Sequence, residues 1–376
     1  MGGARPESTR PCNTAGLACL ADERRAQHDA IHAQPQAFRD AIRNSGATAE
    51  AFAAGIAPAG RTFLVGTGTS LHAAMVGEHL FRLYGGGRLA LAVPAFDFAL
   101  YGPDLRPSDT VVVLSHRGTK RYSLESLGRA AAAGCHTALV CGEGAPAPPV
   151  APDAVLPTVP QEASSAHTVS YTGSIAILSA MAAAVGRRFS EDRLGTPGPL
   201  DAEIPERLEQ SLLLEPMAEA LARRHADHRR IWIAGAGPDA VTALEVALKI
   251  KETSYLQAEG MAVEAMLHGP LQCAESEDLF VLIATATPGA ERLRSLDYMV
   301  QEIGAARLWV GDAAPTSEGG ASTLVVPAVP APFSCLTGLI PLQLLAYHLA
   351  VLRGTNPDGF RLDDPRFARV ARHARL

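Results

Sequence analysis

The chain contains few lysines, few cysteines and no excess of basic charge. Of its 33 basic residues only three are lysines, Lys120, Lys249 and Lys251, so arginine is used almost everywhere that a surface cation would suffice. The net charge of −6, with nearly balanced signs, provides no positive field and argues against nucleic-acid binding. The six cysteines include no CxxC pair, which is typical of reduced structural cysteines in a cytoplasmic protein rather than of disulfides or a zinc site.

Long hydrophobic runs are also missing. No apolar run approaches the ~20 residues that a membrane helix requires, so we expect no membrane span. Residues 1–20 contain a short apolar patch that is followed directly by charged residues, which predicts a disordered leader rather than a secretory signal. With 376 residues and 47% hydrophobic content, the chain can bury a sizeable core, and its length favours two domains.

An internal repeat supports this two-domain organisation. The segments RTFLVGTGTSLHAAMVGEHLF and RIWIAGAGPDAVTALEVALKI share an apolar run, a Gly-x-Gly turn and an alanine-rich helical pattern, and they place Gly66 and Gly235 169 residues apart. At the same offset TVVVLSHRG aligns with LFVLIATAT, and Gly142 aligns with Gly311. A constant offset at three landmarks indicates a duplicated domain.

Apolar strands alternate with helical stretches in both copies, which predicts two tandem, doubly wound α/β domains with parallel sheets of the flavodoxin or Rossmann type. The boundaries that we expect are 21–59 for a helical N-terminal segment, 60–195 and 196–352 for the two domains, and 353–376 for an extended C-terminal tail. We expect the N-terminal helix to break at Pro35 and a further helix to run from Pro205 to Arg224. Ligands of such domains bind at the carboxyl ends of the strands.

Two loops of the first copy carry groups that suit a phosphate. GTGTS follows an apolar run and opens a helix, so Thr69 and Ser70 would offer hydroxyl groups at a helix N-terminus. LSHRGTK follows another strand, and Ser115, Arg117 and Lys120 would add a hydroxyl group, a guanidinium and an ammonium. A ligand-free turn, a solvated pair of cations and a dinucleotide site remain alternatives, although leucine replaces the third small residue of the dinucleotide pattern.

The stretch ALEVALKIKETSYLQAEGMAVEAMLHGPLQ holds two of the three lysines. On a helix Lys249 and Glu252 share a face, whereas Lys251 points away from it. An exposed ion pair, worth at most ~0.5 kcal/mol, could use arginine equally well, but a guanidinium cannot replace a compact, titratable ammonium. Glu252 is a candidate proton shuttle if burial raises its pKa. His268 precedes a Gly-Pro turn that would expose its imidazole, and a structural histidine is the alternative.

These segments together resemble the sugar isomerase (SIS) family, and within it the isomerase domain of the glucosamine-6-phosphate synthases. The resemblance covers about residues 21–376 and is carried by GTGTS, LSHRG, EASSAHTVSYTG, ALEVALKIKETSYLQAE, HGPL and LQLLAYHLAVLRGTNPD. It implies a tandem SIS chain that binds a phosphorylated hexose or aminohexose without a cofactor or a metal. It further implies a homodimer whose subunits share the active site.

The resemblance also implies roles for individual residues. The phosphate would be contacted by Thr69, Ser70, Ser115 and His116, and the rest of the substrate by Ser165 and His167. Glu252 would move a proton between C1 and C2 of the open-chain sugar, and Lys249 would assist it electrostatically. His268 would open the sugar ring and would come from the neighbouring subunit.

Several positions depart from the family pattern. Arg117 and Lys120 stand where the phosphate loop usually has Ser and Thr, and His167 replaces a Ser of the sugar site. The acid expected three residues before His268 is Ala265, with Glu264 one place earlier. The glutaminase domain is not found in the sequence, and the tail NPDGFRLDDPRFARVARHARL lacks the imine-forming lysine of the synthases, its nearest cation being Arg369.

The expected function is therefore a phosphosugar aldose–ketose isomerase, which on an amino sugar phosphate would use or release free ammonia. A non-catalytic sugar-phosphate sensor is the alternative, although we find no helix-turn-helix pattern or basic arm of the kind that such sensors carry. A metal site built from His116, His167 and His268 is a third reading, which lacks the usual ligand spacing.

Overall fold

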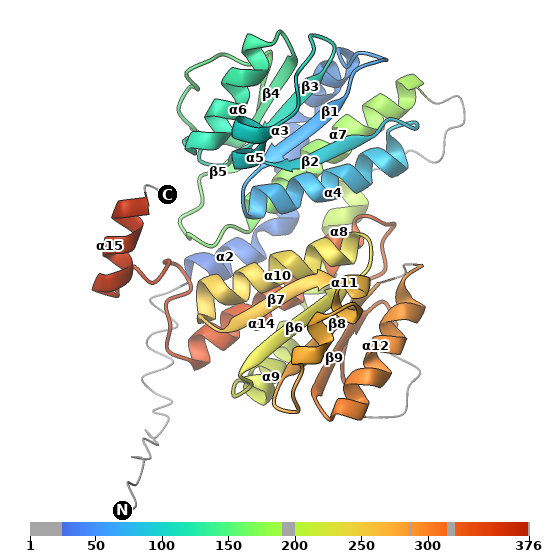
Figure 1. The fold of residues 1–376 in the computed structure, drawn as a ribbon, viewed down its shortest axis with the longest axis vertical. Coiled ribbons are helices and arrows are strands. Elements are labelled where there is room, and N and C mark those ends of the chain that lie inside the picture. Colours follow the sequence, from blue (N-terminus) through green and yellow to red (C-terminus); the bar gives the residue numbers. More distant parts are fainter. Residues whose placement is uncertain (1–24, 190–199, 286–287, 314–319, 375–376) are drawn as a thin grey trace, which may run out of the picture.

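The computed structural model describes residues 25–189, 200–285, 288–313 and 320–374, and Figure 1 shows two α/β domains placed one above the other. The disordered leader expected over 1–20 lies outside the described residues. The N-terminal segment consists of α2 (Ala26–His32) and α3 (Gln34–Ala54). The predicted break thus falls at Ala33, and Pro35 occupies the first turn of α3, where its missing N–H costs no hydrogen bond.

The first domain is built on a parallel sheet in the order β2-β1-β3-β4-β5. Its strands are β1 (Thr62–Gly66), β2 (Ala90–Pro94), β3 (Thr110–Leu114), β4 (His136–Glu143) and β5 (Ala154–Pro160). Its helices are α4 (Thr69–Tyr84), α5 (Ala95–Tyr101), α6 (Arg121–Ala132) and α7 (Val169–Phe189). The central strands β1 and β3 are buried along their whole length, because helices cover both faces of a parallel sheet.

The second domain repeats this arrangement with the equivalent order β7-β6-β8-β9-β10. Its strands are β6 (Arg230–Gly235), β7 (Gln257–Ala262), β8 (Leu279–Ala284), β9 (Ala306–Gly311) and β10 (Ser322–Val325). Its helices are α8 (Leu200–Leu212), α9 (Glu215–His225), α10 (Pro238–Ser254), α11 (Val263–Leu267), the 3₁₀ turn η1 (Pro270–Cys273), α12 (Ala290–Ile303), α13 (Ser334–Thr337) and α14 (Leu339–Leu352). The duplicated doubly wound fold predicted from the constant offset is therefore confirmed.

Two expectations about helices were wrong. The single helix predicted from Pro205 to Arg224 is two helices, α8 and α9, separated by a turn at 213–214. In addition, two helices, Val169–Phe189 and Ser334–Leu352, are long and apolar enough to cross a membrane, although we expected no such run. The fold buries 89% and 83% of their most apolar windows, so both are interpreted as core helices that are hydrophobic on every face. Ser, Thr and Gly residues interrupt their apolar runs and made them hard to see in the sequence.

One continuous hydrophobic core joins both domains and the N-terminal segment. Fully buried members come from five helices: Phe38, Leu80, Ile175, Ile250 and Leu344. Each such side chain contributes roughly 1.5–3 kcal/mol relative to an exposed one. Helices α4 and α10, which follow the glycine turns of the two copies, contact each other across the domain boundary. The functional loops of the first domain are thereby held against the lysine-bearing helix of the second.

The C-terminal tail returns from α14 toward the domain boundary and ends in α15 (Pro365–Ala374), which stands beside the body in Figure 1. Thr355 donates through Oγ1 to the carbonyl oxygen of Thr253 at 2.7 Å. The carboxylate of Asp358 accepts the N–H groups of Ala26 and Gln27 at 3.2 and 2.7 Å. The tail therefore fastens the end of α10 to the start of α2.

Candidate active site

The turn between β1 and α4 places two hydroxyl side chains at the carboxyl edge of the first sheet. A Cβ atom on Gly66 would lie 2.5 Å from the carbonyl group of Ser70, so a side chain cannot be accommodated there. Gly68 has φ 57° and ψ −129°, a conformation that glycine adopts without strain. Because of this turn, Thr69 and Ser70 are the first two residues of α4.

The loop after β3 brings polar and cationic groups to the same edge. Ser115 and His116 are buried, whereas Arg117 and Lys120 are exposed. The hydroxyl group of Ser115 has no hydrogen-bond partner among the described residues. Since buried polar groups are nearly always hydrogen-bonded, and Ser115 lines a cavity, this hydroxyl is suited to bind a ligand.

A third loop, residues 162–168, is organised by the buried carboxylate of Glu162. It accepts hydrogen bonds from the N–H and Oγ1 of Thr168 at 2.8 and 3.2 Å and from the N–H of Ser170 at 3.0 Å. The N–H of Glu162 donates to Nε2 of His116 at 3.1 Å, which places the proton of that neutral ring on Nδ1. This loop presents Ser165 and His167. Glu162 was not predicted as a functional residue, although it is the first residue of the segment EASSAHTVSYTG.

These three loops enclose a cavity of about 350 Å³ at the domain boundary. Its walls contain all eight residues predicted to bind substrate or phosphate, together with Glu252: Thr69, Ser70, Ser115, His116, Arg117, Lys120, Ser165, His167 and Glu252. Phe360 of the C-terminal tail also lines the cavity. The N–H of Ser165 donates to the carbonyl oxygen of Asp358 at 2.9 Å, so the tail holds one wall in place. No local feature of the sequence pointed to this contribution from the tail.

A buried chain of charges reaches the cavity from the second domain. Lys249 is 0% exposed and donates through Nζ to Oε2 of Glu252 at 2.6 Å and to Oγ1 of Thr69 at 3.1 Å. Its Nζ also lies 3.4 Å from Oε1 of Glu245, which is equally buried. Glu245 in turn accepts from Oγ1 of Thr69 at 3.1 Å and lies 2.6 Å from Nδ1 of His72. Lys249 and Glu252 share a helix face as predicted, whereas Glu245 and His72 were missed.

These buried charges shift the pKa values of Glu245 and Glu252 in opposite directions. Burial lowers the pKa of Lys249, but the charges of Glu245 and Glu252 outweigh it, so the net pKa is raised and Lys249 remains an ammonium. Burial would raise the pKa of Glu245, yet the neighbouring Lys249 and His72 lower it overall. Burial raises the pKa of Glu252 above its ordinary value despite the attraction of Lys249. Glu252, whose side chain is 19% exposed, is therefore the carboxylate suited to exchange protons.

Two uncharged imidazoles complete the cavity. Burial lowers the pKa of His167 to about 4 and also lowers the pKa of His116. Their ring centroids are 5.0 Å apart in an edge-to-face arrangement. Both rings are neutral at pH 7, so they can donate or accept hydrogen bonds without adding charge.

His268 does not line this cavity. Its side chain is 75% exposed, as the Gly-Pro turn predicted, and its Nε2 lies 3.1 Å from Oε2 of Glu264. Glu264 also forms an ion pair with Arg292. The structure thus does not bring His268 together with His116 and His167 within one chain, so a single chain does not form the three-histidine metal site.

The second domain carries a buried carboxyl group at the position equivalent to Ser70. Gly237 repeats the backbone of Gly68, with φ 57° and ψ −125°, and Asp239 stands 169 residues after Ser70. The Asp239 carboxylate accepts hydrogen bonds from the N–H and Oγ1 of Thr285, both at 2.8–3.0 Å, and from Oγ of Ser334 at 3.2 Å. Burial raises the pKa of Asp239 to about 7. A buried carboxyl group of the second domain therefore stands at the position of Ser70, which lines the cavity of the first domain.

Comparison with known proteins agrees with this architecture. A model of the SIS domain matches residues 55–184 and again residues 226–353. A glutamine–fructose-6-phosphate aminotransferase (isomerizing) from Thermococcus kodakarensis is 33% identical over 343 residues, which are 87% of this chain and 55% of that protein. This chain thus spans about half the length of that curated relative.

Solved structures show the same fold. The C-terminal domain of a glucosamine-fructose-6-phosphate aminotransferase from Francisella tularensis superposes with a TM-score of 0.77 at 21% identity, covering 89% of this chain and 98% of that one. A tagatose-6-phosphate ketose/aldose isomerase from Escherichia coli superposes with a TM-score of 0.74 at 18% identity, covering 89% and 94%.

Proposed function

The chain belongs to the SIS domain family, and we propose that it is an enzyme that interconverts the aldose and ketose forms of a phosphorylated sugar. The observation that carries this proposal is the position of Glu252. It is a half-buried carboxylate with a raised pKa, paired with Lys249, and it lines the cavity that also contains anion-binding groups. The names of two similar proteins mention fructose 6-phosphate and tagatose 6-phosphate, which supports a sugar phosphate as substrate.

Glu252 would relay a proton between neighbouring carbons. It takes the proton from C2 of the open-chain aldose, the C2–H electron pair forms the C1=C2 bond of an enediol, and the C1=O π pair moves to the C1 oxygen, which takes a proton from water. Glu252 then returns its proton to C1, the C2 hydroxyl releases its proton to water, and the C2=O bond of the ketose forms. Lys249 would keep the carboxylate in position, and the neutral His167 and Ser165, which line the cavity, would hydrogen-bond the enediol oxygens.

The phosphate would lie at the other end of the cavity, against the loops that follow β1 and β3. Ser70 and Ser115 offer hydroxyl groups there, and Arg117 and Lys120 offer positive charge. A cavity of about 350 Å³ is within the range of small-molecule sites. Aminohexose phosphates fit the same proposal, because deamination and isomerisation share the enediol or enamine step.

A panel of hexose and aminohexose phosphates tests the assignment. We expect the purified chain to form a ketose from at least one member, with ammonia released in parallel if that member is glucosamine 6-phosphate. Ketose and ammonia are measured in the same reaction. Tight binding of a sugar phosphate without any turnover would instead support the non-catalytic sensor.

Replacing Arg117 with Ser and Lys120 with Thr should weaken binding of the phosphorylated sugar by more than tenfold, or about 1.4 kcal/mol. The double variant removes both cations from the rim of the cavity, and calorimetric titration measures the loss. Arg121→Ser is the matched control, because Arg121 is paired with Glu125 and does not line the cavity. Equal affinity in the double variant and the control would show that the side chains of Arg117 and Lys120 face solvent and do not bind the substrate.

His268 would act in the cavity of a partner subunit. Its exposed imidazole, oriented by Glu264, is available to a second copy of the chain, and we propose a homodimer in which it opens the sugar ring. Mixing the variants Glu252→Gln and His268→Ala should then restore about a quarter of wild-type activity by random pairing of subunits. The activity of each variant measured alone is the baseline. Activity of the mixture that stays at the mean of the two variants would show that His268 does not act across subunits.

A further inference from the structure

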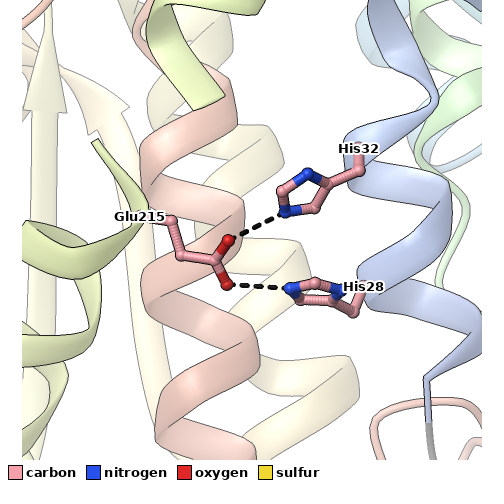
Figure 2. Close-up of side chains that lie close together, drawn as sticks. All are labelled: His28, His32 and Glu215. Carbon is pink, nitrogen blue, oxygen red and sulfur yellow. Dashed lines mark hydrogen bonds and ion pairs between the residues drawn. The ribbon is translucent and has the colours of Figure 1, made fainter. Parts of the chain in front are cut away.

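A cluster of histidines around one carboxylate lies outside the cavity described above. His28 and His32 are four residues apart on α2 and present their rings on the same side of that helix, as Figure 2 shows. Nε2 of His28 lies 2.8 Å from Oε1 of Glu215, and Nε2 of His32 lies 2.8 Å from Oε2 of the same carboxylate. Glu215 is the first residue of α9, so the cluster joins the N-terminal segment to the second domain.

A fourth group supports the same carboxylate. Nε2 of His348 on α14 lies 3.2 Å from Oε1 of Glu215. The Glu215 side chain is 22% exposed and that of His348 is 14% exposed, whereas His32 reaches the surface with 39%. The cluster is thus held in a half-buried position with an opening toward solvent.

We propose that His28, His32 and Glu215 bind a divalent transition-metal ion of the Zn²⁺ type. Two imidazole nitrogens and a carboxylate oxygen are a ligand set that zinc uses in proteins, with a fourth position left for water. The three donor atoms lie within 4.8 Å of one another. A tetrahedral ion with bonds of about 2.0–2.1 Å separates its ligand atoms by about 3.3 Å, so small rotations of the side chains suffice.

The ring nitrogens that face Glu215 can carry either protons or a metal ion. Without a metal, each ring can act as a donor to Glu215 only through a proton on the nitrogen that faces it. One divalent ion satisfies both nitrogens and the carboxylate without placing charge on the rings.

The ion would stabilise the packing of α2 against the second domain and would take no part in the proton transfer by Glu252. It would hold α2 against α9. Helix α2 also binds the C-terminal tail, because the N–H groups of Ala26 and Gln27 donate to the carboxylate of Asp358. The carbonyl oxygen of Asp358 accepts the N–H of Ser165, a residue of the cavity wall. The inference does not depend on the proposed function, since it concerns residues that do not line the cavity.

Titration of the metal-free full-length chain with Co²⁺ and Zn²⁺ tests this site. We expect one ion per chain, visible d–d absorption bands with Co²⁺ that Zn²⁺ displaces, and a higher Tm with Zn²⁺. His32→Gln and Glu215→Gln should each weaken Zn²⁺ binding by at least tenfold, and circular dichroism verifies that both variants fold. If one variant does not fold, the other decides the outcome, because each removes one ligand.

His228→Gln is the matched control. His225 and His228 also approach each other, with Nδ1 and Nε2 3.1 Å apart, but within the described ranges they are not part of a three-ligand group. This variant should bind Co²⁺ like the wild type. The proposal is overturned if the wild-type chain binds neither ion, or if His32→Gln and Glu215→Gln bind as the wild type does. Loss of binding in His228→Gln alone would overturn it as well.

Discussion

Replacing Glu252 with glutamine should lower kcat of the proposed isomerisation by about 10²–10⁴-fold, the usual contribution of a general base. The amide has the same shape as the carboxylate and can still accept a hydrogen bond from Nζ of Lys249, which lies 2.6 Å from Oε2. It cannot accept a proton from a C–H group. The affinity for the sugar phosphate should therefore change little, and steady-state kinetics together with a direct binding measurement separates the two effects.

Glu259→Gln provides the control for this substitution. Glu259 is an exposed residue of β7, the strand that follows α10, so the same chemical change is made near the site without touching the cavity. It should leave kcat within about twofold of the wild type, as surface substitutions usually have small effects. If the Glu252 variant retained the same kcat as this control, Glu252 would have no part in proton transfer.

Replacing Lys249 with methionine should destabilise the fold by about 3–5 kcal/mol, the cost of removing one partner from a buried ion pair. Lys249 is 0% exposed and its ammonium lies between Glu245 and Glu252. Methionine keeps the length of the side chain but leaves Glu245 with less positive charge around it. Urea unfolding measures the change as a lower midpoint with an unchanged slope.

Lys251→Met is the matched control, because Lys251 is exposed on the opposite side of α10. It should change the free energy of unfolding by no more than about 0.5 kcal/mol. Equal stability of the two variants would mean that Lys249 makes no net electrostatic contribution. Lys249→Arg is informative as well, because a guanidinium is larger and planar and should not fit the space between the two carboxylates.

At one position of this arginine-rich chain, the use of lysine has a physical explanation. Lys249 is the fully buried, compact cation of a largely buried network, where the larger guanidinium of arginine should not fit. Lys120 lies at the rim of the cavity and Lys251 in solvent, so the residue type alone did not mark the site. What marked Lys249 was its spacing of three residues from Glu252.

Much of the fold followed from the repeat, because a constant offset of 169 residues fixes equivalent strands without any knowledge of their contacts. The cavity loops followed from the rule that parallel strands end at one edge. Glu245 could also have been predicted, since it lies four residues before Lys249 on the same helix face. Glu162 could not be identified from the sequence, because its role depends on hydrogen bonds within the folded loop.

Contacts between segments that are distant along the chain could not be predicted from the sequence. Phe360 of the C-terminal tail lines the cavity and Asp358 accepts the N–H of Ser165 in its wall, but no periodicity links these two residues to Ser165. The histidines of α2 have the spacing of metal ligands, but Glu215 follows them by more than 180 residues. Only the packing of α2 against the second domain brings these groups together.

The central claim, that Glu252 relays a proton between sugar carbons, is tested most directly by following hydrogen exchange at C2 in D₂O by nuclear magnetic resonance. Wild-type protein should introduce solvent deuterium at C2 of the hexose phosphate that it isomerises. Glu252→Gln should introduce none while still binding that sugar. Exchange at the wild-type rate in the glutamine variant would contradict the account.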